Sequence, residues 1–138
     1  MENKVFLGGT CANTTWRDSL ISVLQVDYFN PVVEDWTFEC QAEEEKQKEV
    51  DCNIHLYIIT KEMQGVFSIA EVVDSVYQKG KRTLLHVIPE GFTISQLKSL
   101  QAVVNLVNKR GGVAYIDSEL NRTARVLNYS FSNYNNGY

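Results

Sequence analysis

The chain has 138 residues, of which 44% are hydrophobic and 22% are charged, a size and balance typical of one globular domain. Its formal net charge is −4 and its basic residues are scattered along the sequence. This pattern argues against a nucleic-acid groove or an anionic membrane surface, because both need a concentrated cationic field. We therefore expect a small-molecule partner.

The cysteines and the N-terminus give expectations about bound cofactors and about the cellular compartment. The three cysteines have no CxxC spacing and no histidine pair lies at metal-ligand spacing, so we expect neither disulfides nor a metal, and no other cofactor. The N-terminus lacks the apolar stretch of a signal peptide, and no apolar run approaches the ~20 residues that span a bilayer. These features predict a cytoplasmic protein without membrane contact.

Apolar periodicity and turn residues predict ten alternating elements. In chain order they are a strand at 5–7, a helix at 15–25, a strand at 27–29, a helix at about 37–50, a strand at 53–60, a helix over 69–77, a strand at 83–88, a helix at 95–108, a strand at 113–116 and a helix at about 118–128. Gly8 and Gly9 are expected to form the turn after the first strand. Residues 129–138 show no periodicity and are expected to form an irregular tail.

The alternation of strands and helices predicts a parallel sheet with helices on both faces. We expect a single α/β domain over residues 1–138, a flavodoxin-like three-layer sandwich with a five-stranded sheet in the order 2-1-3-4-5. Ligands of such sheets bind beyond the carboxyl ends of the strands, where the strand order reverses. Here that crevice is formed by residues 8–11, 60–68 and the start of the following helix.

The crevice carries a carboxylate but no phosphate-binding motif. No GxGxxG follows the first strand and no GxxxxGK[ST] occurs, which disfavours dinucleotide and P-loop sites. Glu71, expected in the first turn of its helix, has two interpretations. With Ser68 it forms an S-x-x-E capping box, a structural role. Alternatively it is a nucleophile for a sugar carbon, with a second carboxylate supplied by Asp35 or by one of the glutamates at 43–45.

Other polar residues near the crevice have less specific interpretations. Arg17 is expected to pair with Glu71, to bind a substrate phosphate or to form a surface ion pair. Cys11 lies at the crevice, but His55 and His86 fall inside predicted strands, so a Cys–His couple is not expected. His86 is expected to be a core histidine with a satisfied ring nitrogen.

Four stretches resemble the nucleoside 2-deoxyribosyltransferase-like superfamily, in particular its short branch that opens with a strand and a Gly-Gly-Thr-Cys turn. They are KVFLGGTC at 4–11 with Trp16-Arg17, DYFNPVV at 27–33 with Trp36, YIIT at 57–60 and GVFSIAE at 65–71. The resemblance covers about residues 4–116, and the Gly-x-x-Ser-x-x-Glu stretch is its moderately specific part.

The resemblance implies a two-step, retaining exchange at the anomeric carbon of a 2-deoxynucleoside or its 5′-monophosphate. Glu71 is the implied nucleophile, and Glu43, with Glu44 next to it, is the implied acid that protonates the departing base. Phe67 or Trp36 is expected to stack on the base. The implied substrate-binding residues are Gly8, Gly9, Thr10, Cys11, Arg17, Asn30, Trp36, Gly65, Phe67, Ser68 and Ser95.

The resemblance also implies a homo-oligomer, because family enzymes borrow a polar residue from a neighbouring subunit. Ser95 or Gln96 matches that position, with Asn128 and Asn133 as rivals.

Departures from the family pattern keep other functions open. The tyrosine that steadies the nucleophile in family enzymes is Phe6 here, and Gln64 and Gly65 stand near the place of an acid that precedes the nucleophile. One alternative is a non-catalytic binder of a nucleotide or an ADP-ribose-like ligand in the same crevice. Another is a structural or interaction protein in which Glu71 is only a helix cap.

Overall fold

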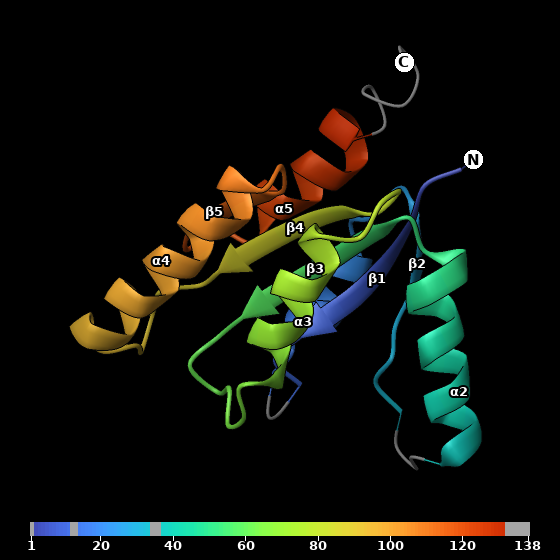
Figure 1. The fold of residues 1–138 in the computed structure, drawn as a ribbon, viewed down its shortest axis with the longest axis horizontal. Helices are drawn as coiled ribbons and strands as arrows, with labels where there is room; N and C mark the ends of the chain where they lie inside the picture. The colour runs from blue at the N-terminus through green and yellow to red at the C-terminus, as the bar shows by residue number, and fades with distance from the viewer. Residues whose placement is uncertain (1, 12–13, 34–36, 132–138) are drawn as a thin grey trace.

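The computed structural model describes residues 2–11, 14–33 and 37–131. Its five strands are all parallel and lie in the order β2-β1-β3-β4-β5, as predicted (Figure 1). The strands are β1 (Lys4–Gly9), β2 (Asp27–Phe29), β3 (Ile54–Ile59), β4 (Arg82–Val87) and β5 (Val113–Ile116). Parallel pairing requires a crossover after each strand, and the helices provide these crossovers.

Helices cover both faces of the sheet (Figure 1). They are α1 (Trp16–Ile21), α2 (Phe38–Lys46) followed by the π-helical turn η1 (Gln47–Asp51), α3 (Phe67–Val76), α4 (Ile94–Lys109), and α5 (Asn121–Arg125) followed by the π-helical turn η2 (Val126–Ser130). Side chains of α1, α5 and η2 pack on one face of the sheet, and those of α3 and α4 pack on the other. The three-layer α/β sandwich is therefore confirmed.

The two faces follow from the alternation of side chains along β3. Ile54, Leu56 and Ile58 face the α1 and α5 side, whereas Tyr57 and Ile59 face α3 and α4. Every residue of β3 is buried, as expected for a strand covered on both faces. In contrast, α2 at the β2 edge of the sheet has no buried residue.

The first helix is shorter than predicted. It ends at Ile21 rather than at residue 25, because Asn128 binds the chain just beyond it. The Asn128 amide donates to the Val23 carbonyl and its oxygen accepts from the Gln25 amide, at 2.9 and 2.8 Å. The Leu24 amide still donates to the Leu20 carbonyl, but the Gln25 amide donates to Asn128, so the helical pattern stops there.

The last helix and the tail also differ from the prediction. The Asp117 carboxylate accepts from the Glu119 amide, so the chain turns there and α5 begins only at Asn121. Helical structure then continues through η2 to Ser130, and Phe131 is 3% exposed in the core. The first residues of the expected tail are therefore ordered packing elements, and residues 132–138 lie outside the described part. Among the described residues, no helix combines the length and apolarity needed to cross a bilayer.

Candidate active site

A pocket of about 230 Å³ lies at the carboxyl ends of β1 and β3, where the strand order reverses. It is lined by Gly9, Thr10, Cys11, Glu62, Met63, Gln64, Gly65, Phe67 and Ser68. The Thr10 hydroxyl accepts from the Thr60 amide at 3.1 Å and so links the ends of the two strands. The structure thus brings most of the predicted substrate-binding residues to one pocket, and Cys11 is exposed there with its thiol near the Gly9 carbonyl.

Gly8 and Gly9 are the last residues of β1 rather than a turn beyond it. Gly9 has φ +108°, and a Cβ there would lie 2.2 Å from the Ile58 carbonyl oxygen. A Cβ at Gly8 would lie 2.8 Å from Cε1 of Tyr57. Both positions need glycine because of the close packing of β1 on β3, a requirement that holds without any ligand.

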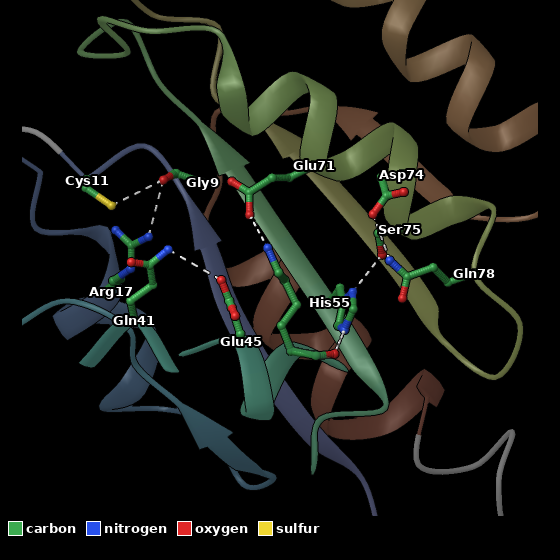
Figure 2. Close-up of polar contacts among 11 residues, drawn as sticks. Gly9, Cys11, Arg17, Gln41, Glu45, His55, Glu71, Asp74, Ser75 and Gln78 are labelled. Carbon is green, nitrogen blue, oxygen red and sulfur yellow. Dashed lines mark hydrogen bonds and ion pairs between the residues drawn. The ribbon is translucent and has the colours of Figure 1, made fainter. Parts of the chain in front are cut away.

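Glu71 does not cap α3. The helix begins at Phe67 with Val66 as its N-cap residue, without a side-chain cap, so Glu71 lies in the second turn and the capping-box interpretation is wrong. The Glu71 carboxylate instead accepts from the Lys48 ammonium, with Nζ 2.6 Å from Oε2 (Figure 2). The two side chains are only 19% and 16% exposed, so this ion pair is largely shielded from water.

The π-helical turn η1 positions Lys48. Its backbone carbonyl accepts a hydrogen bond from Nε2 of His55 at 2.7 Å, which fixes η1 to β3 (Figure 2). Since Nε2 must then carry the proton, Nδ1 accepts from the Ser75 hydroxyl at 2.8 Å, and Ser75 accepts from Thr83 at 2.7 Å. Burial lowers the pKa of His55 to about 4, so the ring is neutral at pH 7. π-Helical turns occur frequently at functional sites.

His86 behaves in the same way on the other face of the sheet, as predicted. Its ring contacts the Thr123 hydroxyl and the Asp117 carbonyl, both at 2.7 Å. Burial lowers the pKa of His86 and keeps it neutral. Both histidines are therefore satisfied core residues, and neither is bonded to Cys11.

The carboxylates of α2 differ in their surroundings. Glu43 is exposed, and its Oε1 accepts from the Gln47 amide at 2.9 Å. Glu44 is half-buried, and burial raises its pKa; the Lys48 charge opposes this effect and the Glu71 charge adds to it. Of the two, Glu44 is thus the residue whose charge interacts with the Glu71–Lys48 pair.

Arg17 is buried and does not pair with Glu71. Its guanidinium donates to the carbonyls of Leu7 and Thr10, at 3.1 and 2.8 Å. It also donates to the carbonyl of Gly9 at 3.4 Å (Figure 2). Burial lowers its pKa. Arg17 therefore fixes the end of β1, and Lys48 takes the role of partner to Glu71.

The remaining predicted site residues lie in different places. Phe67 is 72% exposed beside the pocket, and Asn30 accepts from the Val32 amide in the loop after β2. Ser95 lines a separate pocket of about 280 Å³ between α3 and α4. Trp36 and Asp35 lie outside the described residues.

The candidates for a residue lent to a neighbouring subunit are partly engaged within the chain. Gln96 completes the capping box of α4 with Thr93, and Asn128 binds the end of α1. Asn133 lies outside the described residues. Ser95 is exposed, so it remains a candidate for the residue that contacts a neighbouring subunit.

The sequence patterns did not reveal the importance of Lys48. Lys48 is one of several lysines in a charged stretch of sequence, and its contact with Glu71 of α3 is made from the π-helical turn η1. The described residues hold no group of three His, Cys, Asp or Glu side chains that could bind a metal.

Comparison with known proteins agrees with this geometry. A family model described as nucleoside 2-deoxyribosyltransferase like matches residues 2–92, about two thirds of the chain. Searches of curated proteins and of solved structures found no match. The matched range contains the strands that form the crevice, η1, and the helix that carries Glu71. The chain belongs to the nucleoside 2-deoxyribosyltransferase-like family.

Proposed function

We propose that the protein cleaves or exchanges the N-glycosidic bond of a 2-deoxynucleoside or its 5′-monophosphate, with Glu71 as nucleophile. One observation carries the proposal. Oε2 of Glu71 is held by Lys48 at 2.6 Å, while Oε1 has no hydrogen bond to a described residue. A carboxylate fixed at one oxygen and free at the other is suited to attack a carbon atom.

The reaction proceeds in two steps. Oε1 of Glu71 forms a bond to C1′ as the C1′–N bond breaks, and the departing base takes a proton from an acid on α2. An incoming base nitrogen or a water oxygen then attacks C1′, Glu71 leaves as carboxylate, and the proton of the incoming nucleophile returns to the acid. The configuration at C1′ is retained because the two displacements invert it twice.

Glu44 suits the acid role better than Glu43. A general acid must hold its proton near neutral pH, and partial burial together with the Glu71 charge shifts the pKa of Glu44 in that direction. Glu43 is exposed and bonded to Gln47. The two residues are adjacent, so family position alone does not separate them.

The test is base exchange with a panel of deoxynucleosides, their 5′-monophosphates and free bases. We expect Glu71→Gln to abolish turnover and Glu44→Gln to lower it far more than Glu43→Gln does. Glu49→Gln, an exposed carboxylate on η1, is the matched control and should keep wild-type turnover. Trapping with a 2-fluoro-2-deoxynucleoside should leave a covalent adduct on Glu71 in the mass spectrum.

A second candidate function is ligand binding without turnover. Phe6, at the family's tyrosine position, is buried beside Phe29 with ring centroids 5.9 Å apart and brings no hydroxyl to the crevice. A nucleotide or ADP-ribose-like ligand that raises the Tm without base release would support this function. Turnover or an adduct on Glu71 would contradict it.

We also propose a homo-oligomer whose second copy covers the open side of the crevice. Val66, Phe67 and Ile94 support this, since they are 75%, 72% and 80% exposed at the start of α3 and α4. Such apolar side chains are common at subunit interfaces. Sedimentation equilibrium should give a mass above that of one chain, and Phe67→Asp should shift it toward the monomer. A monomeric wild type would contradict the proposal.

A further inference from the structure

Glu62 gives the pocket at the ends of β1 and β3 its charge. Among the described residues that line this pocket, no other is an aspartate, glutamate, lysine, arginine or histidine. Ser68, which also lines the pocket, lies three residues before Glu71 and so shares one face of α3 with it. A substrate whose C1′ is at Glu71 therefore places part of itself near Glu62.

Thr60 holds Glu62 as a carboxylate. The Thr60 hydroxyl donates to Oε2 of Glu62 at 2.6 Å, and the Glu62 amide donates to the Thr60 hydroxyl oxygen at 3.4 Å. The hydrogen bond from Thr60 lowers the pKa of Glu62. The side chain is therefore ionised at neutral pH and is fixed by a residue only two positions away.

Two basic side chains of the crevice are already committed to other groups. The Arg17 guanidinium is buried and donates to three backbone carbonyls at the end of β1. The Lys48 ammonium is paired with Glu71. Neither can bind a negatively charged group of a substrate without giving up these contacts.

Lys61 directly precedes Glu62 but lines a different pocket. Its stem packs over Gly91, where an added Cβ would lie 2.1 Å from Cδ of Lys61. The neighbouring pocket that Lys61 lines also contains the carboxylate of Glu90. All 13 lysines and arginines of the chain lie in the described residues, so the remaining segments add no further lysine or arginine to the crevice.

The 5′ end of a bound nucleoside should point toward Glu62. The sheet places β1 between β2 and β3, with α2 at the β2 edge and Glu62 in the loop that follows β3 (Figure 1). In the proposed reaction the base faces Glu44 of α2. The opposite end of the sugar, which carries the 5′ oxygen, then faces the loop that contains Glu62.

A phosphate at that end would meet a charge of its own sign. A phosphate monoester carries about −1.5 to −2 charges at pH 7. The first turn of α3 favours an anion through a partial charge of about +0.5, but the full negative charge of Glu62 lies in the same pocket. A free 5′-hydroxyl is neutral and meets no such repulsion.

We propose that the crevice selects unphosphorylated 2-deoxynucleosides over their 5′-monophosphates, and that Glu62 is the residue that rejects the phosphate. This inference rests on the proposed function and narrows its substrate class. An unpaired like charge is an effective way to exclude a competing ligand. Glu62 precedes the 65–71 stretch that carries the family resemblance, so membership of the family does not by itself predict this preference.

The test measures kcat/KM for base exchange with each deoxynucleoside that the wild type uses and with its 5′-monophosphate. We expect the wild type to prefer the nucleoside by about tenfold or more, and Glu62→Gln to bring the two substrates within about threefold. Glu90→Gln removes a carboxylate from the neighbouring pocket and is the matched control, which should keep the wild-type preference.

Salt dependence gives a second measurement that needs no variant. Higher salt screens the repulsion between exposed charges. It should therefore raise kcat/KM of the wild type for the 5′-monophosphate and leave that for the nucleoside unchanged. A fall for the monophosphate would indicate a cationic site and would overturn the inference.

The outcomes separate this inference from the proposed function. If the wild type uses 5′-monophosphates as well as nucleosides or better, the inference is wrong and the proposed function stands. The same holds if Glu62→Gln changes the preference no more than Glu90→Gln does. If the wild type turns over neither class and forms no adduct on Glu71, the proposed function fails and the substrate preference fails with it.

Discussion

Replacing Lys48 by Met tests whether the Lys48–Glu71 ion pair shapes the site. The change keeps the side-chain volume and removes the ammonium. Removing one partner of a fully buried pair costs about 3–5 kcal/mol, and for exposed pairs the value is about 0.2–1 kcal/mol. With the two side chains 19% and 16% exposed, we expect an intermediate loss of about 2 kcal/mol in the free energy of unfolding.

This loss converts to a measurable shift of Tm. At an unfolding entropy of about 2.1 cal/mol/K per residue, the 138-residue chain should lose about 7 °C. Lys46→Met is the matched control. Its ammonium lies 3.5 Å from the Asp51 carboxylate but its side chain is 61% exposed, so we expect a loss below about 0.5 kcal/mol.

A double-mutant cycle completes the experiment. Thermal and urea unfolding of Lys48→Met, of Glu71→Gln and of the double variant give the coupling energy of the pair. The double variant should be more stable than Lys48→Met alone, because it no longer leaves a shielded carboxylate without a partner. If Lys48→Met loses no more stability than Lys46→Met, or if the double variant recovers nothing, the pair does not hold Glu71 and the reasoning is refuted.

Two further predictions concern stability. Burial lowers the pKa of His55 to about 4 against 6.5 in the unfolded chain, so between these values the unfolded state binds more protons. Stability should be full above about pH 6.5 and fall by about 3 kcal/mol toward pH 4, with a shallower decline in His55→Gln; equal slopes in urea unfolding would contradict this. Gly9→Ala should fail to fold or lose several kcal/mol, about 3 or more, because φ is +108° and the added Cβ meets the Ile58 backbone, whereas Gly65→Ala, with open space around it, should keep the wild-type Tm.

The strand order and the place of the crevice could be predicted because they depend on local patterns. The apolar run of β3 and the helical spacing that begins at Ile69 each identify their element, and the parallel crossover rule then orders the sheet. The helix ends could not be predicted in the same way. Asn128 ends α1 from more than a hundred residues away, and no local pattern contains that contact.

In the candidate site, too, local motifs predict some features and long-range contacts determine the others. Glu71 and the pocket residues around Gly65 follow from short motifs, but the partner of Glu71 does not. Ser68 lies three residues before Glu71 and predicts a helix cap. The actual partner of the Glu71 carboxylate is Lys48, which lies on a different element, the π-helical turn η1.

The two carboxylates of the proposed reaction differ in how firmly they are held. Glu71 is paired with Lys48 of η1, which is bonded to the sheet, whereas Glu44 lies on α2, which has few contacts with the core. His55 bonds the Lys48 carbonyl to the sheet, while α2 ahead of it has no buried residue. Opening α2 would expose little apolar surface, so its amides should exchange with solvent far sooner than those of β3. Such an opening would carry Glu44 away and leave Glu71 paired with Lys48. The proposed acid therefore lies on an element that can open while the proposed nucleophile stays paired.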